Sequence, residues 1–356
     1  MGTIKRTFAN NLTGAGKFDA TQLDSNLPAA NIANSSVTNV SALSPSLGSA
    51  IPSVASDPPS PTLGDIWYNT TTGKLKNYTS VAAAWASGGN LSTGRRHGGP
   101  AGTQTAGLYS GGLPFTATAE EYNGSTWTNG GNMNSTRTYL SGFGTQTAAL
   151  ASMGFLQTPP GPSTAIEEYN GSTWTSVNSA PAARNFNAGA GIQTAGFTTG
   201  GEGGRTDTFE YDGTNWSSGG AMSDQKDRHG ACGTLTAGLA FAGEAPDGLV
   251  TASEEYNGTS WTAGGNINTG KGNTAGCGTQ TSALNFGGGL TLTPNLSATE
   301  EYDGTSWTTT ADLGTARGGL AGAGTVEAGL AFGGDSSTAT EEFTPSFNAA
   351  RTVTTS

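Results

Sequence analysis

The sequence is poor in the side chains on which metal and redox chemistry depend. Its 356 residues include two histidines and two cysteines: His97, His229, Cys232 and Cys277. A copper or zinc centre rich in histidine needs more ligands than two residues in separate parts of the chain can supply. We therefore expect no metal ion and no cofactor.

Positive charge and long apolar runs are also scarce. Lysine and arginine number 15 against 26 acidic residues, and the formal net charge of −11 repels the phosphates of nucleic acids. No run approaches the roughly 18 apolar residues of a membrane-spanning helix, and no apolar secretion signal follows the N-terminus. We expect no nucleic-acid partner, no membrane insertion and no secretion.

Glycine and aromatic residues are abundant instead. The chain has 57 glycines, 7 tryptophans, 9 tyrosines and 13 phenylalanines. A turn-rich composition with few helix-forming residues favours an all-β fold, and large aromatic side chains can fill its core.

A nine-residue phrase, EEYNGSTWT, begins at Glu120 and again at Glu167, and looser copies follow. Each copy places a tryptophan five residues after a tyrosine. The pairs are Tyr122 and Trp127, Tyr169 and Trp174, Tyr211 and Trp216, Tyr256 and Trp261, and Tyr302 and Trp307. A less regular earlier copy has Tyr78 and Trp85. This recurrence defines a repeat architecture.

A basic residue stands ten positions after each of these tryptophans. These residues are Arg95, Arg137, Arg184, Lys226, Lys271 and Arg317. A glycine follows each of them seven residues later, so the chain contains six units in the same register.

Units of roughly 42 to 47 residues with glycine-rich turns are typical of four-stranded propeller blades. In the second unit, strands a, b, c and d are predicted, in this order, at RTYLSGFG, TAALASMG, STAIEEYN and STWTSVN. Asn-Gly or Asp-Gly between strands c and d predicts a tight hairpin.

Both ends of the chain carry fragments of a further unit. Strands are predicted at residues 66–69, 74–78 and 83–86, and another begins at Arg351, after Phe343 in the tyrosine position. We therefore predict an all-β propeller of seven blades, with six as the fallback, and a ring closed by strands from both chain ends.

The order of basic residue, strand, Gly-Gly, tyrosine and tryptophan resembles the kelch repeat from about Thr62 to Ser356. More specifically, VASDPPSPTLGDIWYNTTTGKLKNY followed by repeats such as GTQTAAL and EEYNGTSWT resembles virion proteins of tailed phages, particularly those of marine cyanobacteria. The resemblance implies a virion protein, made in the host cytoplasm and located on the tail or the capsid surface.

Residues 1–60 differ in composition from the repeats, since they are rich in Ser, Asn, Ala and Thr and end in the proline-rich SDPPSPT. Such a segment has too little apolar surface to order itself. It is either a flexible leader or an extended anchor that orders on a partner. We predict two parts, an N-terminal anchor and linker over 1–60 and the propeller over 61–356. Other virion proteins are the expected partners of the anchor, in a homo-oligomer within the particle.

Adjacent glutamates such as Glu120 and Glu121 suggest the acid and base of a glycosidase. Because they recur in nearly every unit with the basic residue, we interpret them as structural and predict no catalytic residue. A strand-c glutamate should pair with the Arg or Lys that opens a strand a. Cys232 and Cys277 occupy a position that is mostly alanine, which indicates small buried thiols.

Repetition breaks in the loops between strands b and c. The candidate binding residues in these loops are Phe115, Phe155, Leu156, Leu249 and Leu292. They are expected either to contact another virion subunit or a host-surface glycan, or to fold back over the blades.

The predicted function is a non-enzymatic virion structural protein, a tail fibre or tail-associated appendage that displays a propeller. A capsid decoration protein is the alternative, and a carbohydrate-active hydrolase is the alternative from another class.

Overall fold

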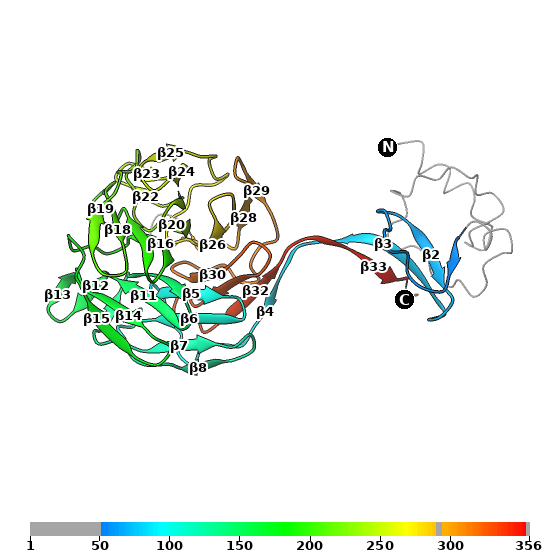
Figure 1. Cartoon of the computed structure of the whole chain (residues 1–356), viewed down its shortest axis with the longest axis horizontal. Coiled ribbons are helices and arrows are strands. Elements are labelled where there is room, and N and C mark those ends of the chain that lie inside the picture. The colour runs from blue at the N-terminus through cyan, green and yellow to red at the C-terminus, as the bar shows by residue number, and fades with distance from the viewer. Residues whose placement is uncertain (1–50, 290–293, 354–356) are drawn as a thin grey trace. The chain divides into compact units, whose positions relative to one another are not determined.

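The computed structural model describes residues 51–289 and 294–353, and every regular element in these ranges is a β-strand. The chain divides into two compact units (Figure 1). Unit 1 takes the described residues up to Ala82 and from Ser346 onward, and unit 2 is Ala83–Pro345. The prediction of an all-β fold is confirmed.

Unit 2 contains six four-stranded antiparallel sheets, of which five are each built from one continuous stretch of sequence and the last takes its fourth strand from the start of unit 2. The first three are β5 (Gly99–Thr103), β6 (Ala106–Ser110), β7 (Ala119–Tyr122) and β8 (Trp127–Asn129); β10 (Ser141–Thr145), β11 (Ala148–Ser152), β14 (Ile166–Tyr169) and β15 (Trp174–Val177); and β16 (Ala188–Ile192), β17 (Ala195–Thr199), β18 (Thr208–Tyr211) and β19 (Trp216–Ser218).

The other three sheets follow the same order of pairing. They are β20 (Gly230–Thr234), β21 (Ala237–Phe241), β24 (Ser253–Tyr256) and β25 (Trp261–Ala263); β26 (Ala275–Thr279), β27 (Ser282–Phe286), β28 (Thr299–Tyr302) and β29 (Trp307–Thr309); and β30 (Ala321–Gly324), β31 (Gly329–Phe332), β32 (Thr340–Thr344) and β4 (Ala84–Ser87). The four strands of each sheet are called a, b, c and d in this order.

Two loops between strands b and c form small sheets of their own. In the second sheet the loop forms β12 (Phe155–Gln157) and β13 (Pro160–Pro162), and β12 also pairs with β9 (Arg137–Thr138), which precedes strand a. In the fourth sheet the loop forms β22 (Glu244–Ala245) and β23 (Gly248–Leu249). These loops are therefore ordered extensions of the second and fourth sheets.

The hairpin between strands c and d follows from its Asn-Gly or Asp-Gly sequence. Tyr122 lies opposite Trp127, and Asn123 Oδ1 accepts hydrogen bonds from the backbone N–H groups two and three residues later, at 3.0 and 2.9 Å. Gly124 has a φ of +87°, a left-handed conformation that glycine adopts without strain. The predicted tight hairpin is confirmed.

Neighbouring sheets are joined by recurring side-chain contacts. The Tyr169 hydroxyl of the second sheet donates to Glu121 Oε1 of the first sheet at 2.5 Å. The first sheet contacts the last in the same way, because the Tyr122 hydroxyl donates to Glu342 Oε1 at 2.6 Å. Each strand a also lies against the next strand a, and β30 lies against β5. The sheets therefore have a propeller-like arrangement (Figure 1).

Unit 1 forms one four-stranded sheet of different construction. Its strands are, in order, β1 (Ser53–Val54), β2 (Ile66–Asn69), β3 (Lys74–Val81) and β33 (Phe347–Thr352). Strands β1 and β2 pair in parallel, whereas the other pairs are antiparallel. Asp57 accepts hydrogen bonds from Lys76 Nζ at 2.6 Å, Asn69 Nδ2 at 2.8 Å and Trp67 Nε1 at 3.0 Å. These contacts, led by Lys76, lower the pKa of Asp57 to about 2.

The two chain ends pair as predicted, with Asn77 opposite Arg351 in unit 1. The prediction that residues 66–86 share one sheet is wrong, because β4 pairs with β32 in unit 2 and places Trp85 opposite Phe343. Tyr78 instead lies opposite Ala350.

The sheet made by both chain ends belongs to unit 1. Among the described residues, unit 2 therefore has six four-stranded sheets, the fallback number, and the predicted seventh is not one of them. The boundary predicted at residue 60 also differs from the division after Ala82. The first 50 residues of the predicted anchor lie outside the described ranges.

Candidate binding site around the central cavity

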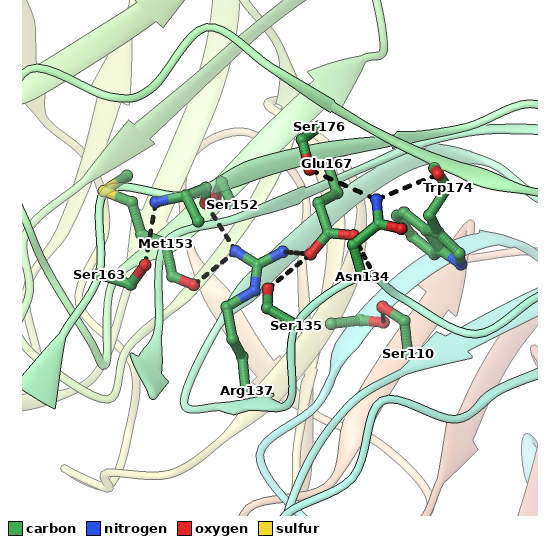
Figure 2. Close-up of polar contacts among 12 residues, drawn as sticks. Ser110, Asn134, Ser135, Arg137, Ser152, Met153, Ser163, Glu167, Trp174 and Ser176 are labelled. Atoms are coloured by element: carbon green, nitrogen blue, oxygen red, sulfur yellow. Dashed lines mark hydrogen bonds and ion pairs between the residues drawn. The ribbon is translucent and has the colours of Figure 1, made fainter. Parts of the chain in front are cut away.

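The six basic residues of the repeat are buried, with exposed fractions of 1% or less. Figure 2 shows Arg137, whose Nη1 donates to the backbone oxygens of Met153 at 2.9 Å and Ala165 at 2.6 Å. Its Nη2 donates to Glu167 Oε1 at 2.9 Å. The equivalent ion pairs are Arg95–Glu120, Lys226–Glu254, Lys271–Glu300 and Arg317–Glu341. The predicted pairing of base and strand-c carboxylate is thus confirmed in five sheets.

In the third sheet the buried basic residue, Arg184, has different partners. Phe209 occupies the place of the first glutamate, and the Arg184 guanidinium lies 3.9 Å from the centre of its ring. The carboxylate partner is Asp207, whose side chain is 48% exposed. Burial lowers the pKa of Arg184 to about 10, against the opposing effect of Asp207. This ion pair is the most exposed of the six.

The second glutamate of each pair normally accepts the hydroxyl of the next sheet's tyrosine. In addition to the two contacts described above, Tyr211, Tyr256 and Tyr302 donate to Glu168, Glu210 and Glu255. Phe343 breaks this series, because it has no hydroxyl to offer Glu301. Burial raises the pKa of Glu301, and the charge of Glu327 adds to the effect.

The predicted loop residues are only partly brought together. The rings of Phe115 and Phe155 lie 6.4 Å apart, and Leu156 follows Phe155 in β12. Leu249 lies in β23 of a different sheet's loop, and Leu292 is outside the described residues. Phe115, Phe155, Leu156 and Leu249 are all half-buried, so they do not form a single exposed patch.

A second set of equivalent positions lies two residues after each basic residue. We call this set the cavity ring: it comprises His97, Tyr139, Phe186, Arg228, Asn273 and Gly319. The backbone N–H of each member donates to the backbone oxygen of the member before it, at 2.8 to 3.0 Å, and His97 donates to Gly319. The six hydrogen bonds therefore form a closed cycle.

All six members have positive φ, between +52° and +66°. Five of them are not glycine, out of nine such residues in the described part of the chain. A left-handed conformation costs a side-chain-bearing residue about 1–2 kcal/mol. The cavity ring is thus the main concentration of backbone strain in the described structure.

The side chains of the cavity ring pack on one another in sequence. The His97 and Tyr139 rings lie 4.7 Å apart, and the Tyr139 and Phe186 rings 4.0 Å apart. The Arg228 guanidinium lies 4.0 Å from the centre of the Phe186 ring. Arg228 Nη1 also contacts Asp227 Oδ1 at 2.7 Å and Glu244 Oε2 at 3.2 Å, so its charge is neutralised locally.

The cavity ring borders a central cavity of about 230 Å³. The six strands a supply the rest of the wall, mainly through glycine and alanine. Gly142 shows why, since a Cβ there would lie 2.6 Å from the Pro100 backbone oxygen of the neighbouring strand. Close approach of neighbouring strands therefore keeps most of this wall small, although Leu140, Phe143, His229 and Leu320 also line the cavity.

Two histidines lie near this cavity in different environments. Burial, with the charges of Arg96 and Arg228, lowers the pKa of His97 to about 3, so its imidazole is neutral at physiological pH. His229 is 6% exposed, lacks a hydrogen-bond partner among the described residues and occupies the position of Leu140 and Leu320. His229 therefore packs between sheets, whereas His97 belongs to the cavity ring.

The two cysteines are unpaired and buried, as predicted. Burial raises the pKa of both thiols, that of Cys277 to about 12. Within the described residues, no group of three His, Cys, Asp or Glu side chains could hold a metal ion. Across the same ranges, no helix is long and apolar enough to cross a membrane.

No protein-family model matches the chain, and no curated protein shows significant similarity to it.

Sequence reasoning missed the cavity ring, although a signal was present. The basic residue and the glycine seven positions later are shared by all six units, but the position two residues after the base holds six different residue types. Variation inside a constant framework marks positions that the fold does not dictate.

Proposed function

We propose that unit 2 is a closed six-bladed propeller of the kelch type. The closed cycle of backbone hydrogen bonds and the contact between the first and last sheets support closure. The pairing of β4 with β32 supports it further, because strands from both ends of unit 2 complete the last sheet. Such closure protects sheet edges from unwanted pairing.

The propeller serves as a binding module of a tailed-phage virion, in a tail fibre or tail-associated appendage. The virion setting rests on the resemblance of the N-terminal motif and the repeats to phage proteins. The binding role rests on one observation, the cavity ring, where strained and dissimilar side chains gather on an otherwise repeated framework.

The anchor over residues 1–60 attaches the chain to other virion proteins, and several copies assemble in the particle. The propeller then contacts another virion subunit or a glycan of the host surface. A capsid decoration protein uses the same parts at a different location and remains the alternative of the same class.

A carbohydrate-active hydrolase is less well supported by the geometry. It needs two carboxylates placed across a substrate, free to exchange protons. The first glutamates of the repeat are held in ion pairs, and five of the second glutamates accept tyrosine hydroxyls. These structural contacts account for the recurrence of the glutamates, so no catalytic role is needed to explain them.

Immunogold electron microscopy of phage particles with antibodies against unit 2 tests the location. Gold on the tail is the expected result, and gold over the capsid would select the decoration protein instead. Particles without label, although the denatured particle proteins react with the antibody, would place the epitope inside and contradict surface display. Complete absence of the chain from particles would overturn the virion role.

A further inference from the structure

We propose that the cavity ring binds the terminal ring of a neutral sugar, with Tyr139 as its platform, Phe186 packed against Tyr139, and His97 and Arg228 nearby. The inference deepens the proposed function, on which its biological setting rests, by naming a site and a ligand class. It can be tested with purified protein alone.

Backbone strain is the first argument for a binding role. Gly319 shows that glycine satisfies the ring position, and glycine would remove the cost of positive φ at the other five. The chain instead carries Tyr139 and Phe186 there, with φ of +55° and +56°. Strain that a simpler residue would relieve, in a fold that tolerates that residue, points to a role for the side chains themselves.

The chemistry of the ring is the second argument. A pyranose has one face of C–H groups, which pack on the electron-rich face of an aromatic ring, and an edge of hydroxyl groups. Tyr139 supplies the aromatic surface, and Phe186, which lies between Tyr139 and the Arg228 guanidinium, supports the Tyr139 ring. The neutral imidazole of His97 offers one donor and one acceptor, and the Tyr139 hydroxyl offers both. Neither group makes a hydrogen bond to another described residue, so both are available to a ligand.

The volume of the cavity and the charges beside it restrict the class of ligand. Pockets for drug-sized molecules measure about 300–1,000 Å³, and a cavity of about 230 Å³ therefore suits a single ring rather than a longer chain. Arg228 lies against both Asp227 and Glu244, so its positive charge is matched within the protein. The site therefore has no unmatched positive charge for an anionic sugar and favours a neutral one.

The test is titration of the full chain with methyl glycosides of glucose, galactose, mannose and N-acetylglucosamine, followed by saturation-transfer NMR and calorimetry. We expect saturable binding of at least one of them. The double variant Tyr139→Gly/Phe186→Gly should bind that sugar at least about tenfold more weakly, as the loss of an aromatic platform implies. Because the chain already has glycine at the equivalent Gly319, this variant should retain the fold.

Two further variants make the result specific. Ile192→Thr, at the far end of β16, gives the third sheet the threonine found at this position in the other five and should leave the affinity unchanged. Phe155→Ala tests the loop between strands b and c. Loss of binding in Phe155→Ala but not in the double glycine variant would move the site to that loop and overturn the proposal.

The remaining outcomes are equally decisive. The proposal is wrong if no neutral glycoside binds, or if only glucuronic acid or N-acetylneuraminic acid does. Either result would leave the virion assignment standing, because particle labelling tests that assignment separately. Conversely, sugar binding by a chain absent from particles would retain the site and overturn its setting.

Discussion

Arg137 and Tyr139 are two residues apart and illustrate two kinds of position. Arg137 has a basic counterpart in all six repeats, and its guanidinium is fully buried against a carboxylate and two backbone oxygens. Tyr139 has a different counterpart in every repeat and borders the cavity with positive φ. The comparison teaches that the constant position maintains the sheet, while the variable position is free to serve binding.

The largest expected effect is on the constant position. Arg137→Met leaves Glu167 buried without its cation, and removal of one partner of a buried ion pair typically costs about 3–5 kcal/mol. Denaturant unfolding should show a loss of this size. Arg137→Met/Glu167→Leu should recover part of it, since two apolar residues leave no buried charge. An unchanged midpoint in Arg137→Met would show that the ion pair does not maintain the sheet.

A smaller loss is expected for Arg184→Met. The Asp207 carboxylate is half exposed, so water can solvate it once the cation is gone, and the methionine can still pack on Phe209. We expect the free energy of unfolding to fall by about 1–3 kcal/mol in the same assay. A loss equal to that of Arg137→Met would contradict the view that partner exposure sets the cost.

The junction that lacks a tyrosine hydroxyl offers a gain of stability. Phe343→Tyr should place a donor beside Glu301 and stabilise unit 2 by about 0.5–1.5 kcal/mol. Tyr302→Phe is the matched control, because it removes the bond to Glu255 and should destabilise by a similar amount. Equal stability of both variants and the parent protein would mean that these hydroxyls do not join neighbouring sheets.

Glu301 also makes this junction sensitive to pH. Its pKa is raised in the folded protein, so the folded state binds the proton more strongly than the unfolded chain does. Stability should therefore fall as the pH rises through the titration of this carboxyl. Glu301→Gln should reduce this decline in the free energy of unfolding, measured from acid to neutral pH. An unaltered pH profile would show that other groups cause the decline.

Most of the sheet framework was predictable from the sequence because its signals are local and repeated. The Tyr–Trp spacing, the Asn-Gly turns and the base with its carboxylate each act within one repeat or between neighbours. The buried cysteines followed from the alanines at equivalent positions.

The chain ends were harder to place because their partners are distant in sequence. Seven residues separate Tyr78 from Trp85, rather than the five of the regular hairpins, and Trp85 pairs with Phe343 instead. No local signal links β4 to β32 across more than 250 residues. The cavity ring was missed for a different reason: its members resemble one another in position and conformation but not in residue type.

The most direct test measures stability and sugar binding together in Tyr139→Gly/Phe186→Gly. The account predicts a free energy of unfolding within about 1 kcal/mol of the parent protein, since relief of backbone strain offsets the lost ring contacts, and a clear loss of glycoside binding. A variant that unfolds readily, or that binds the sugar as well as the parent protein, would contradict the separation of structural from binding positions.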